Sequence, residues 1–205
     1  MARKTKQQPQ RNKFIILTSG KRSEKNYLTA LKDKQSIYDV TVTFSNTDPQ
    51  GLVKQAVNLK TKQNFVWCVF DKDDFPSTGI QEAFKTAREN GIGVAFSNIS
   101  FEVWLLYHFR KFSNERTVPQ LMAELDKLLE SKHYNNGYSK ADEKVIKRIF
   151  LPQINNALTN AKIVHQERIK EYHETHNDDN FPYCEWNSFT DVYRLVEALK
   201  LKGLK

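Results

Sequence analysis

The sequence predicts an α/β protein in which a parallel β-sheet is flanked by helices and followed by a helical elaboration. Short apolar runs rich in β-branched and aromatic residues alternate with stretches of helical periodicity as far as about residue 110. Such runs are typical of strands buried on both faces, and their alternation with helices implies right-handed crossovers. Beyond residue 110 only helical patterns remain. We therefore expect a disordered basic tail at 1–12, an α/β core at 13–110, and a helical elaboration at 111–205 that packs on the core.

Four strands are expected in the core. The first and third are uninterrupted apolar runs, FIILT and FVWCVF, whereas the second alternates between apolar and polar residues. We predict these strands at residues 14–18, 38–44, 65–70 and 92–97.

Amphipathic patterns predict the helices. In the core, Ser23 and Ser100 are expected to act as N-caps of the first and last helix. A polar loop at 173–187 is expected before the final helix. The predicted helices are residues 23–34, 51–62, 79–90, 101–109, 118–131, 139–150, 152–172 and 188–201.

The composition excludes several classes of protein. No apolar run approaches the roughly 20 residues needed to span a bilayer, and the N-terminal residues lack the apolar segment of a signal peptide. We therefore expect a cytoplasmic protein with no membrane association. Cys68 falls in a buried strand and Cys184 in a polar loop, so neither a disulfide framework nor a cysteine zinc site is expected.

The chain carries a formal net charge of +8, and part of it is concentrated near the N-terminus. Arg3, Lys4 and Lys6 lie in this tail, followed by Arg11 and Lys13. A basic tail of this kind can contact nucleic acid phosphates, or it can simply act as a solubilising end. Both interpretations stay open.

The third strand ends in a group of acidic residues, Asp71, Asp73 and Asp74. In open α/β sheets, ligands bind beyond the carboxyl ends of the strands. Carboxylates gathered there repel one another until a divalent cation or a basic partner neutralises them. The alternative is that Asp73 or Asp74 only begins a loop before Pro76. A metal site is the interpretation we favour.

Other polar groups are expected at the same edge of the sheet. They include Glu24 after the Gly20 turn, Ser97 with Asn98 after the fourth strand, and Glu102 in the next helix. The Gly20 turn has neither the spacing of a Walker P-loop nor that of a dinucleotide-binding loop. Oxygen ligands without His or Cys suit Mg²⁺ or Mn²⁺ rather than zinc, and such ions stabilise charge in phosphodiester cleavage.

The motifs and their order resemble a known family. A strand with a glycine turn and carboxylate, followed by a strand ending in D-x-D, resembles the Toprim domain of topoisomerases, primases and overcoming-lysogenization-defect nucleases. Five motifs follow one another along nearly the whole chain: GKRSEKNY (20–27), FDKDD (70–74), SNISFEVWLLYHF (97–109), YSK (138–140) and NSFTDVYRLV (187–196). By these motifs the chain is more narrowly similar to the RloB-like family, and F-E-x-W-L-L-x-H-F is the most specific of them.

The resemblance implies a Toprim-like sheet and a metal site, with one departure. The leading Toprim Glu, a metal ligand or general base, would fall at Ser19. A serine hydroxyl coordinates metals poorly and cannot act as a base near neutral pH. Either Glu24, Asp71 and Asp73 suffice for the site, or the site is weakened.

Several further residues have two interpretations. Lys140 can reach a phosphate across the cleft or can be a solvated lysine, and Glu102 can be catalytic or can favour its helix dipole. Lys21 and Arg22 are expected to hold a nucleic acid backbone. His108 is expected to pack near the core rather than to act as a ligand.

Two functions follow. The first is a Mg²⁺- or Mn²⁺-dependent Toprim nuclease acting on RNA, including transfer RNA, or on DNA; the resemblance implies a role in defence against phage or foreign DNA beside an ATPase partner. The second is a non-catalytic nucleic-acid-binding or sensor subunit that retains the fold. Phosphatase chemistry of the haloacid dehalogenase type is disfavoured, because Phe75 stands where that motif has Thr or Val and the acids follow the third strand. The sequence is compatible with a homo-oligomer and does not specify an oligomeric state.

Overall fold

The computed structural model describes residues 11–32, 36–134, 136–140 and 142–201. Its centre is a sheet of five strands in the order β2-β1-β3-β4-β5. The first four strands are parallel, which confirms the prediction, and β5 is antiparallel to β4. The strands are β1 (Lys13–Thr18), β2 (Asp39–Phe44), β3 (Asn64–Asp71), β4 (Gly93–Asn98) and β5 (Phe189–Thr190).

The helices follow the strands in the predicted alternation as far as α4. The region predicted as one helix at 139–150 is a short α-helical turn that continues as a π-helical turn, Ile146–Phe150, and a 3₁₀ turn, Leu151–Gln153. The α-helices are α1 (Ser23–Lys32), α2 (Pro49–Leu59), α3 (Ser77–Glu89), α4 (Glu102–Tyr107), α5 (Val118–Ser131), α6 (Glu143–Val145), α7 (Ile154–His173) and α8 (Val192–Ala198).

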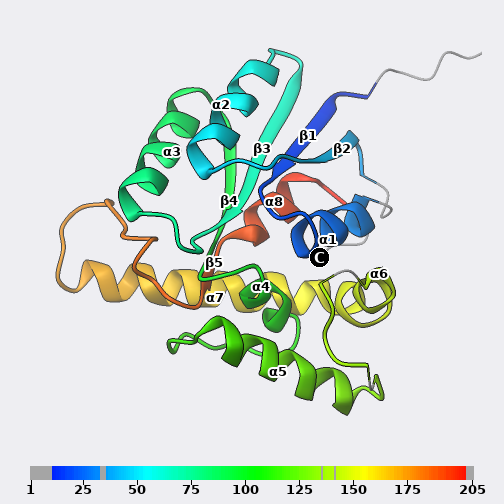
Figure 1. Cartoon of the computed structure of the whole chain (residues 1–205). Coiled ribbons are helices and arrows are strands. Elements are labelled where there is room, and N and C mark those ends of the chain that lie inside the picture. The colour runs from blue at the N-terminus through cyan, green and yellow to red at the C-terminus, as the bar shows by residue number, and fades with distance from the viewer. Residues whose placement is uncertain (1–10, 33–35, 135, 141, 202–205) are drawn as a thin grey trace, which may run out of the picture.

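Helices cover both faces of the sheet (Figure 1). On one face, α2 and α3 pack over Val66, Cys68 and Phe70 of β3. On the other face, a larger core joins the sheet to α1, α4 and α8, and continues without interruption into α5 and α7. In Figure 1, α7 runs beneath the sheet, and α5 lies below α7, on the side away from the sheet. The helical elaboration therefore packs on the α/β core, as expected.

The expectation of no strand beyond residue 110 is wrong. Phe189 and Thr190 pair with Asn98 and Ser97 and extend the sheet by one antiparallel strand. Two residues are too short to show a strand periodicity, so the sequence pattern gives no signal for β5. The final helix is correspondingly shorter than the predicted 188–201.

Two predicted caps are also wrong. Ser23 is the first residue of α1, and its hydroxyl turns inward to Glu102 instead of capping the helix. The Ser100 hydroxyl is buried without a hydrogen-bond partner in the described part of the chain. Cys184 lies in the loop before β5, as expected, and it is buried because this loop packs against the sheet; Cys68 and Cys184 are both free thiols.

The predicted tail residues Arg3, Lys4 and Lys6 lie outside the described residues. Within the described residues, no helix combines the length and the apolar character needed to cross a bilayer.

Candidate active site

The candidate site lies at the carboxyl ends of β1, β3 and β4. The parallel register aligns Thr18 with Val69 and Asp71 with Ser97, so these strands end at one edge. Three buried carboxylates come together there: Glu24 from α1, Asp71 from β3 and Glu102 from α4.

Asp71 is the last residue of β3 and is almost fully buried. Its Oδ2 atom accepts a hydrogen bond of 3.0 Å from the backbone N–H of Phe101. Its Oδ1 atom is buried and has no hydrogen-bond partner among the described residues. A buried carboxylate oxygen without a donor is costly unless it binds a proton or a cation.

Glu102 begins α4 and is completely buried. Its Oε1 atom accepts hydrogen bonds from Ser23 Oγ and Tyr138 Oη, both at 3.1 Å, and lies 3.2 Å from Lys140 Nζ. Its Oε2 atom, like Oδ1 of Asp71, is buried with no partner in the described part of the chain. The α4 dipole alone does not account for this set of contacts.

Glu24 reaches the site because Gly20 has no side chain. A Cβ atom on Gly20 would lie 1.8 Å from Cδ and from Oε2 of Glu24, so any other residue would displace this carboxylate. The turn before it is held by Ser19 N–H, which donates to Val69 O at 3.0 Å. The Ser19 side chain is partly buried.

The three carboxylates influence each other's ionisation. Burial, with a smaller contribution from Glu102, raises the pKa of Glu24 to about 7 despite a backbone hydrogen bond and Lys140, which lower it. Burial, then Glu24 and Glu102, raise the pKa of Asp71 well above its usual range. The cluster therefore tends to hold protons near neutral pH when no further cation is present.

Lys140 is the cation that the structure brings to this cluster. Burial lowers the pKa of Lys140, but Glu102, Glu24 and Asp71 outweigh that effect and raise it. Its side chain stays half-exposed, so the ammonium group is accessible from solvent. Lys140 is thus a cluster residue and not simply a solvated lysine.

The other predicted acids lie at the rim. Asp73 has a left-handed backbone (φ 37°), and the residue as a whole is exposed. Partial desolvation of its carboxyl group raises the pKa of Asp73; Lys140 lowers this pKa and Asp74 raises it. Asp74 is exposed and is not brought into the Glu24, Asp71 and Glu102 cluster. Lys72 is turned away from the cluster and donates from Nζ to Phe75 O.

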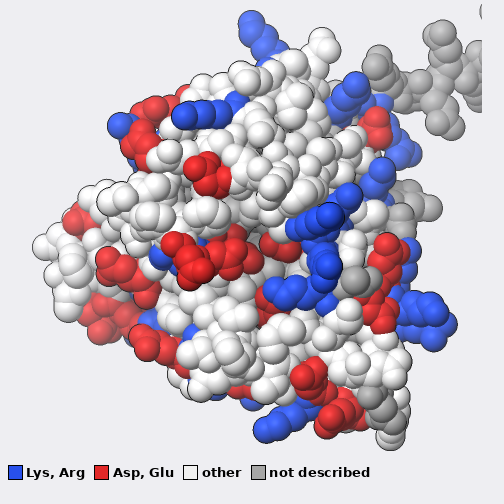
Figure 2. Space-filling view, in the orientation of Figure 1, with Lys and Arg blue, Asp and Glu red and all other residues white. Residues whose placement is uncertain are grey.

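The basic residues lie beside the cluster. Lys21 and Arg22 are exposed at the start of α1. Figure 2 shows Lys and Arg side chains gathered over α1, next to Asp and Glu side chains in the middle of the same face. The acidic cluster is therefore bordered by exposed basic side chains on this face.

Ser23 and Tyr138 are site residues that sequence reasoning missed. Their hydroxyl groups lie 3.1 Å apart and both donate to Glu102. Tyr138 comes from the segment before α6, far from Glu102 in sequence, so only tertiary structure brings it here. His108 is packed in the core, where its Nε2 lies 2.9 Å from Tyr27 Oη.

The carboxylate oxygens of this cluster are ligands of the kind that hard divalent cations such as Mg²⁺ prefer. Buried carboxylate oxygens are available, and two of them, on Asp71 and Glu102, have no hydrogen-bond partner in the ranges that the structure describes. Within the described ranges, however, no three His, Cys, Asp or Glu side chains already form a metal-binding arrangement. Mg²⁺ commonly uses one or two carboxylates and takes its remaining ligands from water and substrate phosphates. A Mg²⁺ site at this cluster would therefore not need three preformed protein ligands.

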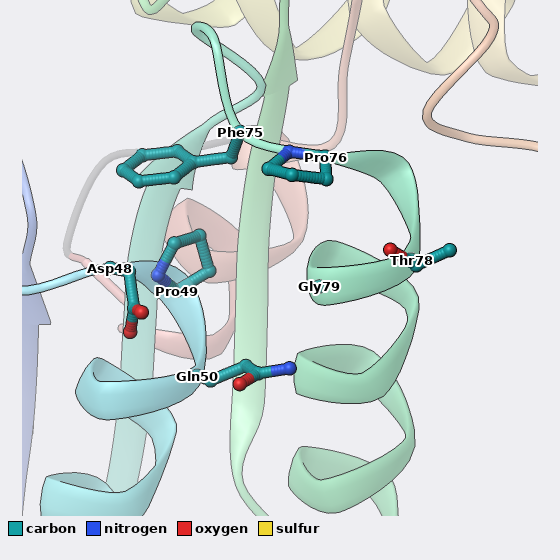
Figure 3. A pocket seen from close by; sticks show the side chains of 7 residues that line it. All are labelled: Asp48, Pro49, Gln50, Phe75, Pro76, Thr78 and Gly79. Atoms are coloured by element: carbon teal, nitrogen blue, oxygen red, sulfur yellow. The ribbon is translucent and has the colours of Figure 1, made fainter.

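A separate hollow of about 320 Å³ lies between the first turns of α2 and α3 (Figure 3). Its charged lining residue is Asp48, whose Oδ1 accepts from Gly51 N–H and so caps α2. The hollow offers no acid–base pair, and we assign the chemistry to the carboxylate cluster.

Comparison with known proteins identifies one family. The model of the RloB-like protein family matches residues 14–199, which include all the elements described above except Lys13, the first residue of β1. The chain shows no significant match to a curated protein or to a solved structure. Because the match extends over most of the sequence, the chain belongs to the RloB-like protein family.

Proposed function

We propose that this RloB-like protein is a Toprim-type nuclease that uses Mg²⁺ or Mn²⁺ to cleave RNA, transfer RNA included, or DNA. The observation that carries the proposal is the buried cluster of Glu24, Asp71 and Glu102 at the carboxyl edge of the sheet, in which two oxygens have no partner among the described residues. Such a cluster costs free energy in the resting protein, and a bound cation would offset this cost.

Each residue has a role in this proposal. Asp71 and Glu102 would hold the cation with their free oxygens, and Glu24, whose pKa is about 7, would exchange a proton near neutral pH. Lys140 would bind a phosphate oxygen, and the exposed Lys21 and Arg22 would hold the adjoining backbone. The ion would supply stabilisation of the charge that develops on the phosphodiester.

The resemblance to this family also suggests a biological role and a partner protein. A member of this family of Toprim-like proteins would act in defence against phage or foreign DNA, beside an ATPase partner. Nucleic acid is the substrate class that fits a basic surface next to clustered acids. The cleavage test below distinguishes RNA from DNA as the preferred substrate.

Metal binding is the first test. Calorimetric titration of Mn²⁺ should show binding to the wild-type chain and its loss in Asp71→Asn, which keeps the acceptor for Phe101 N–H but removes the charge. Asp39→Asn is the matched control, because Asp39 is exposed at the opposite end of a strand. Equal Mn²⁺ affinity in all three proteins would refute the proposed site.

Cleavage is the second test. Labelled transfer RNA, single-stranded RNA and duplex DNA should be incubated with the protein and Mn²⁺, and at least one should be cut by the wild type and left intact by Asp71→Asn. Metal binding without cleavage of any of them would favour the second candidate function.

That second candidate is a non-catalytic nucleic-acid-binding subunit. It is favoured by Ser19 at the position of the Toprim Glu, and by Lys140, which already neutralises part of the cluster. Ser19→Glu distinguishes the two functions: a weakened nuclease gains activity in this variant, whereas a binding subunit gains none.

A further inference from the structure

The edge of β4 lies open in a groove that shares no residue with the carboxylate cluster. The groove has a volume of about 730 Å³ and is lined by α3, β4, α8 and the loop before β5. We call it the β4 groove and define it by Lys85, Arg88, Val94, Phe181 and Arg194.

The backbone of β4 is only partly paired on this side. Phe96 directs both its groups away from β3: its N–H donates to Asp191 Oδ1 at 2.6 Å, and its C=O accepts from Asp191 N–H at 3.0 Å. Since alternate residues of a strand point their backbone groups to the same side, Val94 directs its N–H and C=O there too. Within the described residues β5 pairs only with Ser97 and Asn98, so no strand meets Val94.

Helices flank this open edge on both faces of the sheet. Ala83 and Ala87 of α3 pack on one face, and Val192 and Val196 of α8 pack on the other. The groove therefore lies at the edge of the sheet between these two helices, and no strand among the described residues pairs with the backbone of Val94 there. This is the geometry in which an extended peptide adds a strand.

The aromatic residues that line the groove form walls rather than a slot for a nucleobase. The Phe84 and Tyr183 rings meet edge to face with centroids 6.2 Å apart, and the Phe181 and Tyr183 centroids are 5.9 Å apart. The Trp67 ring lies over Gly93, where a Cβ atom would come within 2.3 Å of it. The rings are thus already engaged with the protein, and this favours a peptide over a nucleotide.

The exposed basic residues of the groove favour an acidic ligand. Lys85 and Arg88 are exposed, and neither takes part in an ion pair among the described residues. The groove also holds two acids: Asp191 lies 3.5 Å from Arg194, and Asp179 lies 3.1 Å from His173 Nε2, which is charged only when it is protonated. Lys85 and Arg88 are therefore the cations that an acidic ligand would meet. We propose that the β4 groove binds an extended, acidic segment of another protein, which pairs with Val94 and meets Lys85 and Arg88.

The test uses the full chain and a surface-displayed library of short random peptides. Selection should enrich acidic sequences without proline, and their affinity should fall at least about tenfold, or about 1.4 kcal/mol, in the double variant Lys85→Glu/Arg88→Glu. Lys127→Glu, an exposed charge reversal on α5, is the matched control and should bind as the wild type does.

Backbone pairing is tested at Val94. Hydrogen exchange should show a fast Val94 amide in the free protein and a protected one with the selected peptide. Val94→Pro removes this N–H and should weaken binding to a similar degree; if this variant fails to fold, the exchange result and the charge reversal decide the matter. Peptides that bind all variants equally, an absence of enriched peptides, or protection of Val94 by AMP or ATP instead would each overturn the proposal.

Discussion

At Gly20, the missing side chain decides where the Glu24 carboxylate can lie. Gly20→Ala places a Cβ atom 1.8 Å from this carboxylate, so Glu24 must move out of the cluster. Because the atoms that it meets are the far end of a flexible side chain, we expect Glu24 to swing away with little change in the free energy of unfolding, measured with urea, and with weaker Mn²⁺ binding. Gly79→Ala is the control, since the nearest atom to its Cβ would be 3.9 Å away. A Gly20→Ala protein that binds Mn²⁺ as tightly as the wild type would contradict the position given to Glu24 here.

At Lys140, one ammonium group moderates the ionisation of the acids around it. Lys140 lowers the pKa of Glu24, while burial and Glu102 raise it to about 7. Lys140→Met should therefore raise the Glu24 pKa further, measured by carboxyl ¹³C NMR titration of the metal-free protein. Lys21→Met removes an exposed lysine nearby and should leave the titration unchanged. A Glu24 pKa that does not move in Lys140→Met would show that the two groups are not coupled.

Among the elements, β4 and α8 are joined through the buried side chain of Asp191. Burial raises the Asp191 pKa to about 6, although Phe96 N–H and Arg194 oppose this shift. Because the folded protein holds this proton more tightly than the unfolded chain does, stability should fall as the pH rises from about 4 to 6. Asp191→Asn keeps an acceptor for Phe96 N–H and removes the ionisation. We expect the wild type to lose up to about 3 kcal/mol relative to this variant across that range, measured by urea unfolding at several pH values.

Comparison of the predicted and observed strands and helices shows which of them the sequence pattern identifies. β1 and β3 were predicted within one or two residues, because an apolar run between turn residues has few alternatives in a parallel sheet. β5 escaped prediction because its two residues are a strand only through their pairing with β4. Ser23 was expected to cap α1, but the buried Glu102 carboxylate is the acceptor that its hydroxyl meets.

Over the whole molecule, one apolar core runs from the sheet into the helical elaboration. Phe150 is completely buried in it, with its ring against His108 and Phe109. Phe150→Ala should cost about 3–5 kcal/mol, and the loss should appear equally in probes of the sheet and of the helices. Ile163→Ala, on the exposed side of α7, should cost much less. Separate unfolding transitions for the sheet and the helices would contradict a continuous core.

The sequence by itself determined the alternation of strands and helices, the parallel direction of the first four strands, and the edge of the sheet at which Glu24, Asp71 and Glu102 lie. It could do so because burial on both faces of a sheet leaves a local signature, and because parallel strands end at one edge. Only the tertiary structure decided that Tyr138, Ser23 and Lys140 surround Glu102, that Asp74 stays outside the cluster, and that β4 keeps an open edge. These features depend on contacts between segments far apart in the chain, and such contacts leave no periodicity in the sequence.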